Sequence, residues 1–130
     1  MILLDTHVVV WLMTSPERIS KAAAEAIAAC GAQGERPAVS SATVFEIAYG
    51  VRRGRIKIHT PSTEFLNRLR GPFNLLPITE GIAFEAAAFA EPFHGDPIDR
   101  IIAATAMVED CVLLTVDGKI RDAGVCKTLW

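Results

Sequence analysis

The hydrophobic residues of this chain fall into short continuous runs that are separated by longer amphipathic segments. Residues 1–4, 38–40 and 112–116 form three such runs. Short, fully apolar runs are typical of strands that are buried on both faces of a parallel sheet. Weaker runs at 75–78 and 125–129 predict two more strands. Strands that alternate with helices predict an α/β fold, with a central parallel sheet flanked by helices.

The segments between these runs carry signals for the starts and ends of helices. Ser15-Pro16-Glu17 suits the cap and first turn of an alanine-rich helix that ends near Cys30, before a loop at 31–37. Thr79 is expected to cap a helix that runs to about Ala90, where Pro92 breaks it, and Asp96-Pro97 is expected to open the next one. Three more helices are predicted within 8–13, near 44–51 with Gly50 and Gly54 at the end, and from Thr60-Pro61 to Gly71.

Composition indicates one globular domain over residues 1–130. The chain is 51% hydrophobic and 22% charged, which gives enough apolar material for one core, and its length leaves no room for a second domain. Its net charge of −2 lacks the basic excess of proteins that hold nucleic acid mainly through its phosphates. Any contact with nucleic acid must therefore be local.

The cysteines and the N-terminal run bear on where the protein resides. Cys30, Cys111 and Cys126 are odd in number and include no CxxC pair, which disfavours a disulfide framework and a structural zinc site. The apolar run at 1–4 meets Asp5 too early for a signal peptide or a membrane span. We therefore expect a cytoplasmic protein with no membrane association.

Four acids are placed where an α/β sheet binds ligands. Asp5 and Asp117 directly follow predicted strands, and Asp99 lies in the first turn of a helix expected at the same edge. Glu46 interrupts an apolar helical stretch, where an inward-facing carboxylate needs a partner or a cation. Each acid alone has an ordinary structural explanation, as a strand end, a turn or a helix start. The combination favours a single acidic site.

Carboxylates gathered at one site repel one another unless a cation keeps them ionised. Oxygen ligands without a set of histidine and cysteine favour magnesium or manganese over zinc or copper. The acids therefore predict a site for Mg²⁺ or Mn²⁺. The sequence leaves open whether one or two ions bind.

Four blocks of the sequence, in this order and spacing, resemble the VapC-type toxins of the PIN-domain family. These blocks are Leu3-Leu4-Asp5-Thr6-His7, residues 41–50 with Glu46, residues 96–106 (DPIDRIIAATA) and Leu114-Thr115-Val116-Asp117. The resemblance extends from Met1 to Trp130. It implies a PIN-like parallel sheet flanked by helices, a Mg²⁺- or Mn²⁺-dependent endoribonuclease that acts as a toxin, and inhibition by a cognate VapB-like antitoxin.

By position, the resemblance assigns Asp5, Glu46, Asp99 and Asp117 to the family's four acids. In the expected mechanism, metal held by Asp5 and Asp99, with support from Glu46 and Asp117, activates a water that attacks the RNA phosphate in line. Asp117 is the least secure ligand, because the segment 118–125 is brief. Asp96 is more readily explained as a helix cap than as a metal ligand, and both roles stay open.

Several other polar residues have a functional and a structural interpretation. Thr6 and Thr115 flank the strand-end acids and are expected at most to support them. Several basic and histidine side chains could contact RNA or simply face solvent, and Arg100 could also pair with a neighbouring acid. These residues are His7, His94, Arg52, Arg53, Arg55, Lys57 and Arg100. The sequence does not identify the RNA, because targets differ through surface shape and loop contacts.

Apolar helical residues suggest either core packing or contact between subunits. Trp11, Met13, Phe84 and Phe89 belong to this group, and the small residues of 83–90 allow close helix contact. The family resemblance adds homodimers as the working expectation.

Two other functions remain as alternatives. An aspartate-using phosphohydrolase or phosphoacceptor fits poorly, because Thr6-His7 follows Asp5 where a second aspartate would be expected. A noncatalytic binding module with the same fold is disfavoured by the intact set of acids.

Overall fold

The computed structural model describes residues 1–58, 62–91, 93 and 95–130. Its centre is a sheet of five strands in the order β3-β2-β1-β4-β5, and all neighbouring strands run parallel. The strands are β1 (Ile2–Leu4), β2 (Ala38–Ser40), β3 (Asn74–Leu76), β4 (Val112–Leu114) and β5 (Thr128–Leu129). The predicted parallel α/β sheet is confirmed.

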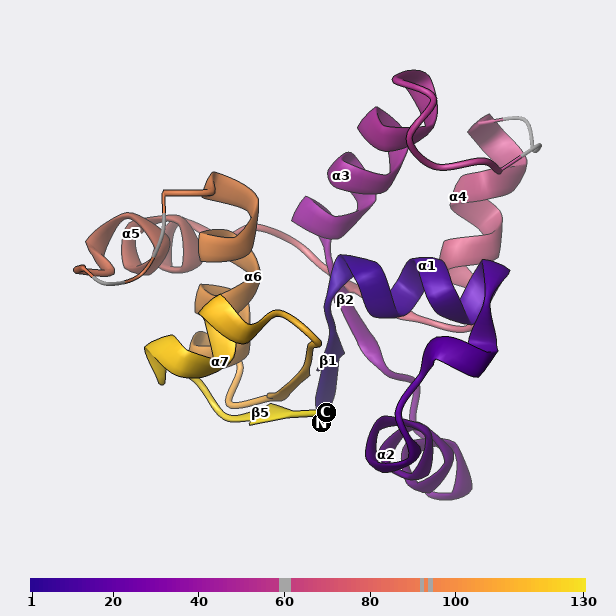
Figure 1. Ribbon diagram of the computed structural model, residues 1–130, viewed down its shortest axis with the longest axis horizontal. Helices are drawn as coiled ribbons and strands as arrows, with labels where there is room; N and C mark the ends of the chain where they lie inside the picture. The colour runs from indigo at the N-terminus through magenta and orange to yellow at the C-terminus, as the bar shows by residue number, and fades with distance from the viewer. Residues whose placement is uncertain (59–61, 92, 94) are drawn as a thin grey trace.

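Helices cover both faces of this sheet (Figure 1). They are α1 (Thr6–Thr14), the short 3₁₀ helix η1 (Pro16–Arg18), α2 (Lys21–Ala32), α3 (Ser41–Arg52), α4 (Ser62–Arg70), α5 (Glu80–Ala88), α6 (Pro97–Val108) and α7 (Gly118–Ala123). Figure 1 shows α6 and α7 on one side of the strands and α1 and α2 on the other. None of the helices within the described ranges is long and apolar enough to cross a membrane.

The core has two halves because successive strand residues point to opposite faces. Leu3 of β1 and Leu113 of β4 pack with Ile102, Ala103 and other residues of the α6 side. The next strand positions, including Leu4 and Leu114, pack with residues of α1, α2 and α4 on the opposite side. Parallel strands with both faces covered in this way read as continuous apolar runs, as the sequence does.

Three details differ from the sequence-based expectation. Ser15 makes no side-chain cap, because Pro16 begins only a 3₁₀ turn, and Ser20 caps α2 by accepting from the Ala23 N–H. The segment 118–125 was not expected to be helical, yet it contains α7. All strands except β2 are shorter than their apolar runs. The expected helix start at Thr60-Pro61 and the break at Pro92 lie outside the described residues.

Candidate active site

Asp5 lies where β1 ends and α1 begins. Its backbone N–H donates to the Leu114 carbonyl at 3.1 Å, so the β1–β4 pairing continues to the aspartate. The side chain is 2% exposed. Its Oδ1 accepts from the Thr6 N–H at 2.7 Å, and its Oδ2 accepts from the Thr115 hydroxyl at 2.6 Å. A carboxylate held in this way on both oxygens has a fixed position and is poorly accessible as a phosphoacceptor.

Asp117 lies after β4, the strand next to β1, at the start of α7. Its Oδ1 caps α7 by accepting from the Lys119 and Ile120 N–H groups at 2.7 and 3.4 Å. Its own N–H donates to the Thr115 hydroxyl oxygen at 3.0 Å. Thr115 therefore bonds to the side chain of one acid and the backbone of the other.

Asp99 and Asp96 occupy the N-terminus of α6. Asp96 Oδ1 accepts from the Ile98 N–H at 2.9 Å and from the Asp99 N–H at 3.4 Å, so the predicted cap is confirmed. Asp99 is half-buried in the first turn. A contact between Asp96 and a metal remains a prediction.

Glu46 approaches from the middle of α3, which packs against both α1 and α6. Its carboxyl is partly buried, and the Thr6 side chain hydrogen-bonds to it. The hydroxyl oxygens of Thr6 and Thr43 lie 3.2 Å apart in a buried hydrogen bond. Thr43 was not singled out from the sequence, because a threonine in a helix three residues before an acid has no distinctive pattern.

The four acids act on one another electrostatically. Burial, with a smaller contribution from the negative charges of Asp96, Asp5, Asp117 and Glu46, raises the pKa of Asp99 to about 7. Burial also raises the pKa of Asp5 and, with the charge of Asp5, the pKa of Glu46. Hydrogen bonds from Thr115 and Thr6 oppose these shifts without cancelling them. The structure thus brings together all four acids that the sequence proposed.

A divalent cation fits this site by donor type and by charge. Carboxylate oxygens are the ligands that Mg²⁺ and Mn²⁺ prefer, and a cation would offset the burial and the repulsion that raise the pKa values of Asp5, Glu46 and Asp99. The fit does not extend to a ready-made cage: within the described ranges, no three His, Cys, Asp or Glu side chains are close enough together to hold a metal ion. Asp5 and Asp117 instead use their oxygens to cap helices.

The basic and histidine residues near the acids differ in their surroundings. Arg100 donates to the carbonyls of Ala86, Phe89 and Phe93 at 2.9–3.2 Å. His7 is exposed, with Nδ1 4.0 Å from Asp5 Oδ2. The exposed basic residues after Glu46 are Arg52, Arg53, Arg55 and Lys57. His94 lies outside the described residues.

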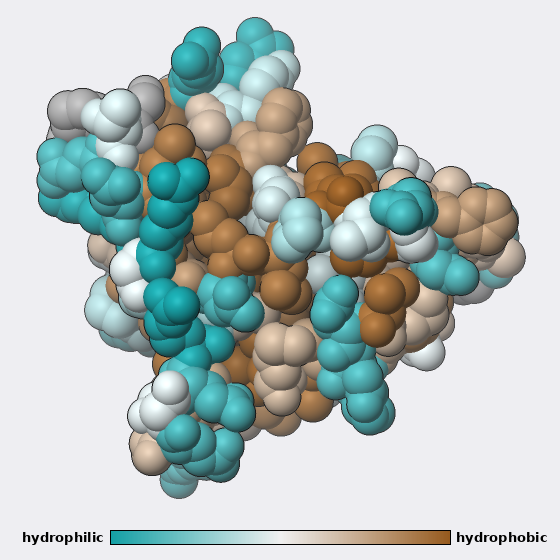
Figure 2. All heavy atoms as spheres, turned by 180° about the vertical axis from the view of Figure 1, so that it is seen from behind, coloured by the Kyte–Doolittle hydropathy of each residue, from teal (hydrophilic) through white to brown (hydrophobic). Residues whose placement is uncertain are grey.

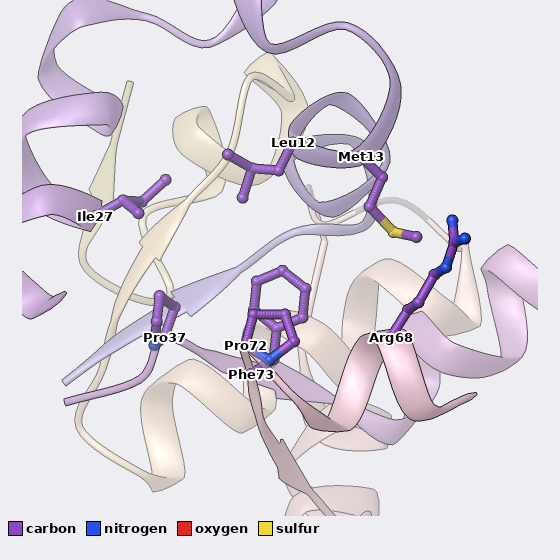
Figure 3. Close-up of a pocket in the computed structure, with 7 residues that line it drawn as sticks. All are labelled: Leu12, Met13, Ile27, Pro37, Arg68, Pro72 and Phe73. Carbon is purple, nitrogen blue, oxygen red and sulfur yellow. The ribbon is translucent and has the colours of Figure 1, made fainter. Parts of the chain in front are cut away.

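Two cavities bear on the position of the site. One of about 560 Å³ includes Glu46, Asp96 and His7 in its wall and so adjoins the acids. Another, of about 430 Å³, opens between α1, α2 and α4 and contains no acidic residue; its lining includes Leu12, Met13 and Arg68 (Figure 3). From the side opposite to Figure 1, apolar side chains gather in the middle of the face and polar ones surround them (Figure 2).

Comparison with known proteins agrees with this architecture. The PIN domain family matches residues 2–125. Ribonuclease VapC22 of Mycobacterium tuberculosis is 35% identical over 120 residues, which cover 92% of this chain and 89% of that protein.

Two solved structures share the fold over nearly the whole chain. A toxin-antitoxin complex from Klebsiella pneumoniae has a TM-score of 0.68 at 23% identity, covering 100% of this chain and 97% of that one. DNA-bound VapBC from Salmonella typhimurium has a TM-score of 0.74 at 16% identity, covering 99% and 98%. The predicted PIN-like fold is confirmed, and the chain belongs to the PIN-domain family, among its VapC-type members.

Proposed function

We propose that this protein is a metal-dependent endoribonuclease that acts as the toxin of a toxin-antitoxin pair. The observation that carries the proposal is the electrostatic coupling of Asp5, Glu46, Asp99 and Asp117 at one edge of the sheet. Burial and neighbouring negative charge raise the pKa values of Asp5, Glu46 and Asp99, and such acids gathered at one place are typical of a site that holds a metal ion in a nuclease. The similarity to a protein named as a ribonuclease supports the choice of RNA.

Asp5, Asp99, Glu46 and Asp117 are the proposed ligands, and Asp96, which caps α6, is a further candidate for contact with the metal. Mg²⁺ or Mn²⁺ is the proposed ion, since all of these donors are hard oxygens. When bound, the ion would offset phosphate charge and make a nearby water more acidic. The number of ions is left open, because four carboxylates can serve either arrangement.

The chain's own groups have separate roles in this proposal. Asp5, fixed by Thr115 and the Thr6 N–H, is the rigid ligand. Asp99 has a pKa of about 7 and so exchanges a proton near neutral pH, and binding of the cation requires its ionised form. Glu46 and Asp117 add negative charge to the proposed metal site. The water that attacks the phosphate would approach within this ring of oxygens.

The partners follow from the relatives. Two of the solved structures with this fold are toxin-antitoxin assemblies. We therefore propose a cognate VapB-like antitoxin, a homodimeric toxin and action on RNA in the cytoplasm, with residues 1–130 working as one domain.

Cleavage of structured RNA by purified, antitoxin-free protein tests this function. We expect cleavage with Mg²⁺ or Mn²⁺, none with EDTA, and none by Asp99→Asn or by Asp5→Asn, because each lacks a proposed ligand. Asp122→Asn, at an exposed acid of α7 beyond the site, is the matched control and should cleave normally. Cleavage that persists in EDTA or in the folded Asp99→Asn protein would contradict the proposed site.

A further inference from the structure

The cavity beside the acids has the size and lining of a site for one nucleotide base. Its volume of about 560 Å³ lies within the range of small-ligand pockets. Phe45 and Tyr49 of α3 and Ile98 of α6 supply apolar walls, and Glu46 connects the cavity to the acidic site. The cavity is therefore continuous with the place where a phosphate would be cut.

Three planar side chains line up along α3 next to this cavity. Phe45 and Tyr49 are 59% and 45% exposed, although both are large and apolar. Their rings stack with centroids 5.7 Å apart and an angle of 16° between the planes. The Arg53 guanidinium lies 5.3 Å from the Tyr49 ring centroid. Spacing of four residues places all three on one helix face, as a stack with aromatic rings towards the acids and positive charge at the far end.

The turn after α3 brings a second positive charge to the cavity. Gly54 adopts φ +72°, and the N–H groups of Arg55 and Ile56 then both donate to the Gly50 carbonyl. Ile56 packs so closely on Gly50 that an added Cβ would lie 2.7 Å from its Cδ1. This turn places Arg55 in the cavity wall.

We propose that this cavity receives one unstacked base of single-stranded RNA, adjoining the phosphate to be cut. This inference rests on the proposed ribonuclease function. Aromatic faces bind bases of any sequence by stacking, and arginines bind the phosphates that follow. A neutral base also tolerates Glu46 and Asp96, because its N–H groups can donate to carboxylates that would repel a phosphate.

Charge favours RNA over a second copy of the chain as the occupant. Arg53 contacts the Tyr49 ring, Arg55 lines the cavity, and Arg52 and Lys57 are further exposed basic residues of the same segment. RNA suits both kinds of charged group here, since its phosphates are opposite in charge to the arginines and its base N–H groups can donate to the carboxylates of Glu46 and Asp96.

Binding of a fluorescein-labelled, 12-nucleotide single-stranded RNA of mixed sequence tests the inference. Fluorescence anisotropy in EDTA measures affinity without cleavage. We expect Tyr49→Ala to raise Kd by roughly 5- to 100-fold, the contribution of a base–aromatic contact. Tyr49→Phe keeps the ring and should bind like wild type. Phe84→Ala, at an aromatic residue of α5 that is 73% exposed and outside the cavity lining, is the matched control and should also bind normally.

An RNA series with one abasic nucleotide at each successive position identifies the stacked base. Wild type should lose affinity at one position, and Tyr49→Ala should show no such position. Equal binding by wild type and Tyr49→Ala, or no binding by wild type, would overturn the inference. A change in the mass of Tyr49→Ala by light scattering would instead identify the surface as a contact between subunits and would also overturn it.

Cleavage kinetics separate this inference from the proposed function. Tyr49→Ala should raise KM for RNA and leave kcat nearly unchanged. Wild type that cleaves no RNA would remove the proposed function itself. Wild type that cleaves with the same KM as Tyr49→Ala would leave the function intact and remove only the base site.

Discussion

Thr115 and Asp5 are 110 positions apart in the sequence, and the hydroxyl of Thr115 donates to Asp5 Oδ2 at 2.6 Å in a buried contact. The same hydroxyl accepts from the Asp117 N–H. The Thr115 side chain thus holds both Asp5, which follows β1, and Asp117, which follows β4. Loss of this hydroxyl would leave a buried carboxylate with fewer partners.

We expect Thr115→Val to destabilise the fold by about 1.5–3 kcal/mol, the usual contribution of a hydrogen bond to a charged group. The change should also raise the pKa of Asp5 further, since the Thr115 bond is the largest of the effects that lower it. Urea denaturation measures the stability. Thr115→Ser keeps the hydroxyl and should retain most of the wild-type stability. Equal losses of stability in Thr115→Val and Thr115→Ser would assign the effect to packing.

The raised pKa of Asp99 predicts that stability of the metal-free protein falls as pH rises. The folded state binds this proton up to a pH of about 7, and the unfolded state releases it near the model value of 3.8. The resulting stabilisation is complete below that lower value and is lost as pH rises through about 7.

Asp99→Asn removes the contribution of Asp99 to this dependence. In EDTA at pH 8 we expect the variant to be more stable than wild type by about 1 kcal/mol, a small figure because the half-exposed side chain is screened by solvent. Near pH 4 the stabilities of wild type and Asp99→Asn should be nearly equal. Thermal denaturation at both pH values measures this difference, and a variant that is less stable at pH 8 would show that repulsion among the acids is negligible. Added Mg²⁺ or Mn²⁺ should stabilise wild type and leave the variant unchanged.

Arg100 is expected to stabilise the fold and not to contact RNA. Its guanidinium joins the end of α5 to the start of α6 through three carbonyls. Arg100→Ala should cost about 2–3 kcal/mol of unfolding free energy, because these partly buried carbonyls lose a charged donor. Chemical denaturation measures the loss. Arg100→Lys cannot reproduce the planar fork and should recover only part of it. Full stability of Arg100→Ala would show that solvent replaces the guanidinium.

Gly50 is expected to matter because of Ile56 and not because of its backbone conformation. Gly50→Ala places a methyl group against Ile56 Cδ1 and should cost about 1–3 kcal/mol through overpacking. Shortening the neighbour in the double variant Gly50→Ala/Ile56→Val should restore part of the stability. Denaturation of the two single variants and the double variant measures this coupling. Additive losses would mean that the two side chains adjust independently.

The sequence predicted the strands and the acids because both have strong local signals. Buried parallel strands are continuous apolar runs, and Asp5 and Asp117 directly follow the runs at 1–4 and 112–116. The cap at Asp96 follows from Asp-Pro at a helix start. These features depend on neighbours in the sequence and so are visible in it.

The parts that were not predicted depend on contacts between distant segments or on competing local signals. Ser15 and Ser20 both offer a hydroxyl before a helix, and only the three-dimensional path selects Ser20. The bonds of Arg100 reach carbonyls 7 to 14 positions away, which no sequence pattern specifies. The role of Thr115 as a link between two acids likewise requires the register between β1 and β4.

The order of the strands has a consequence for synthesis of the protein on the ribosome. β1 emerges first, yet its central place in the sheet is completed only when β4 pairs with it, and the Asp5 N–H finds its carbonyl partner at Leu114. A nascent chain shorter than 112 residues lacks both β4 and Asp117. The four acids therefore come together only late in translation, so that an unfinished chain carries no assembled site.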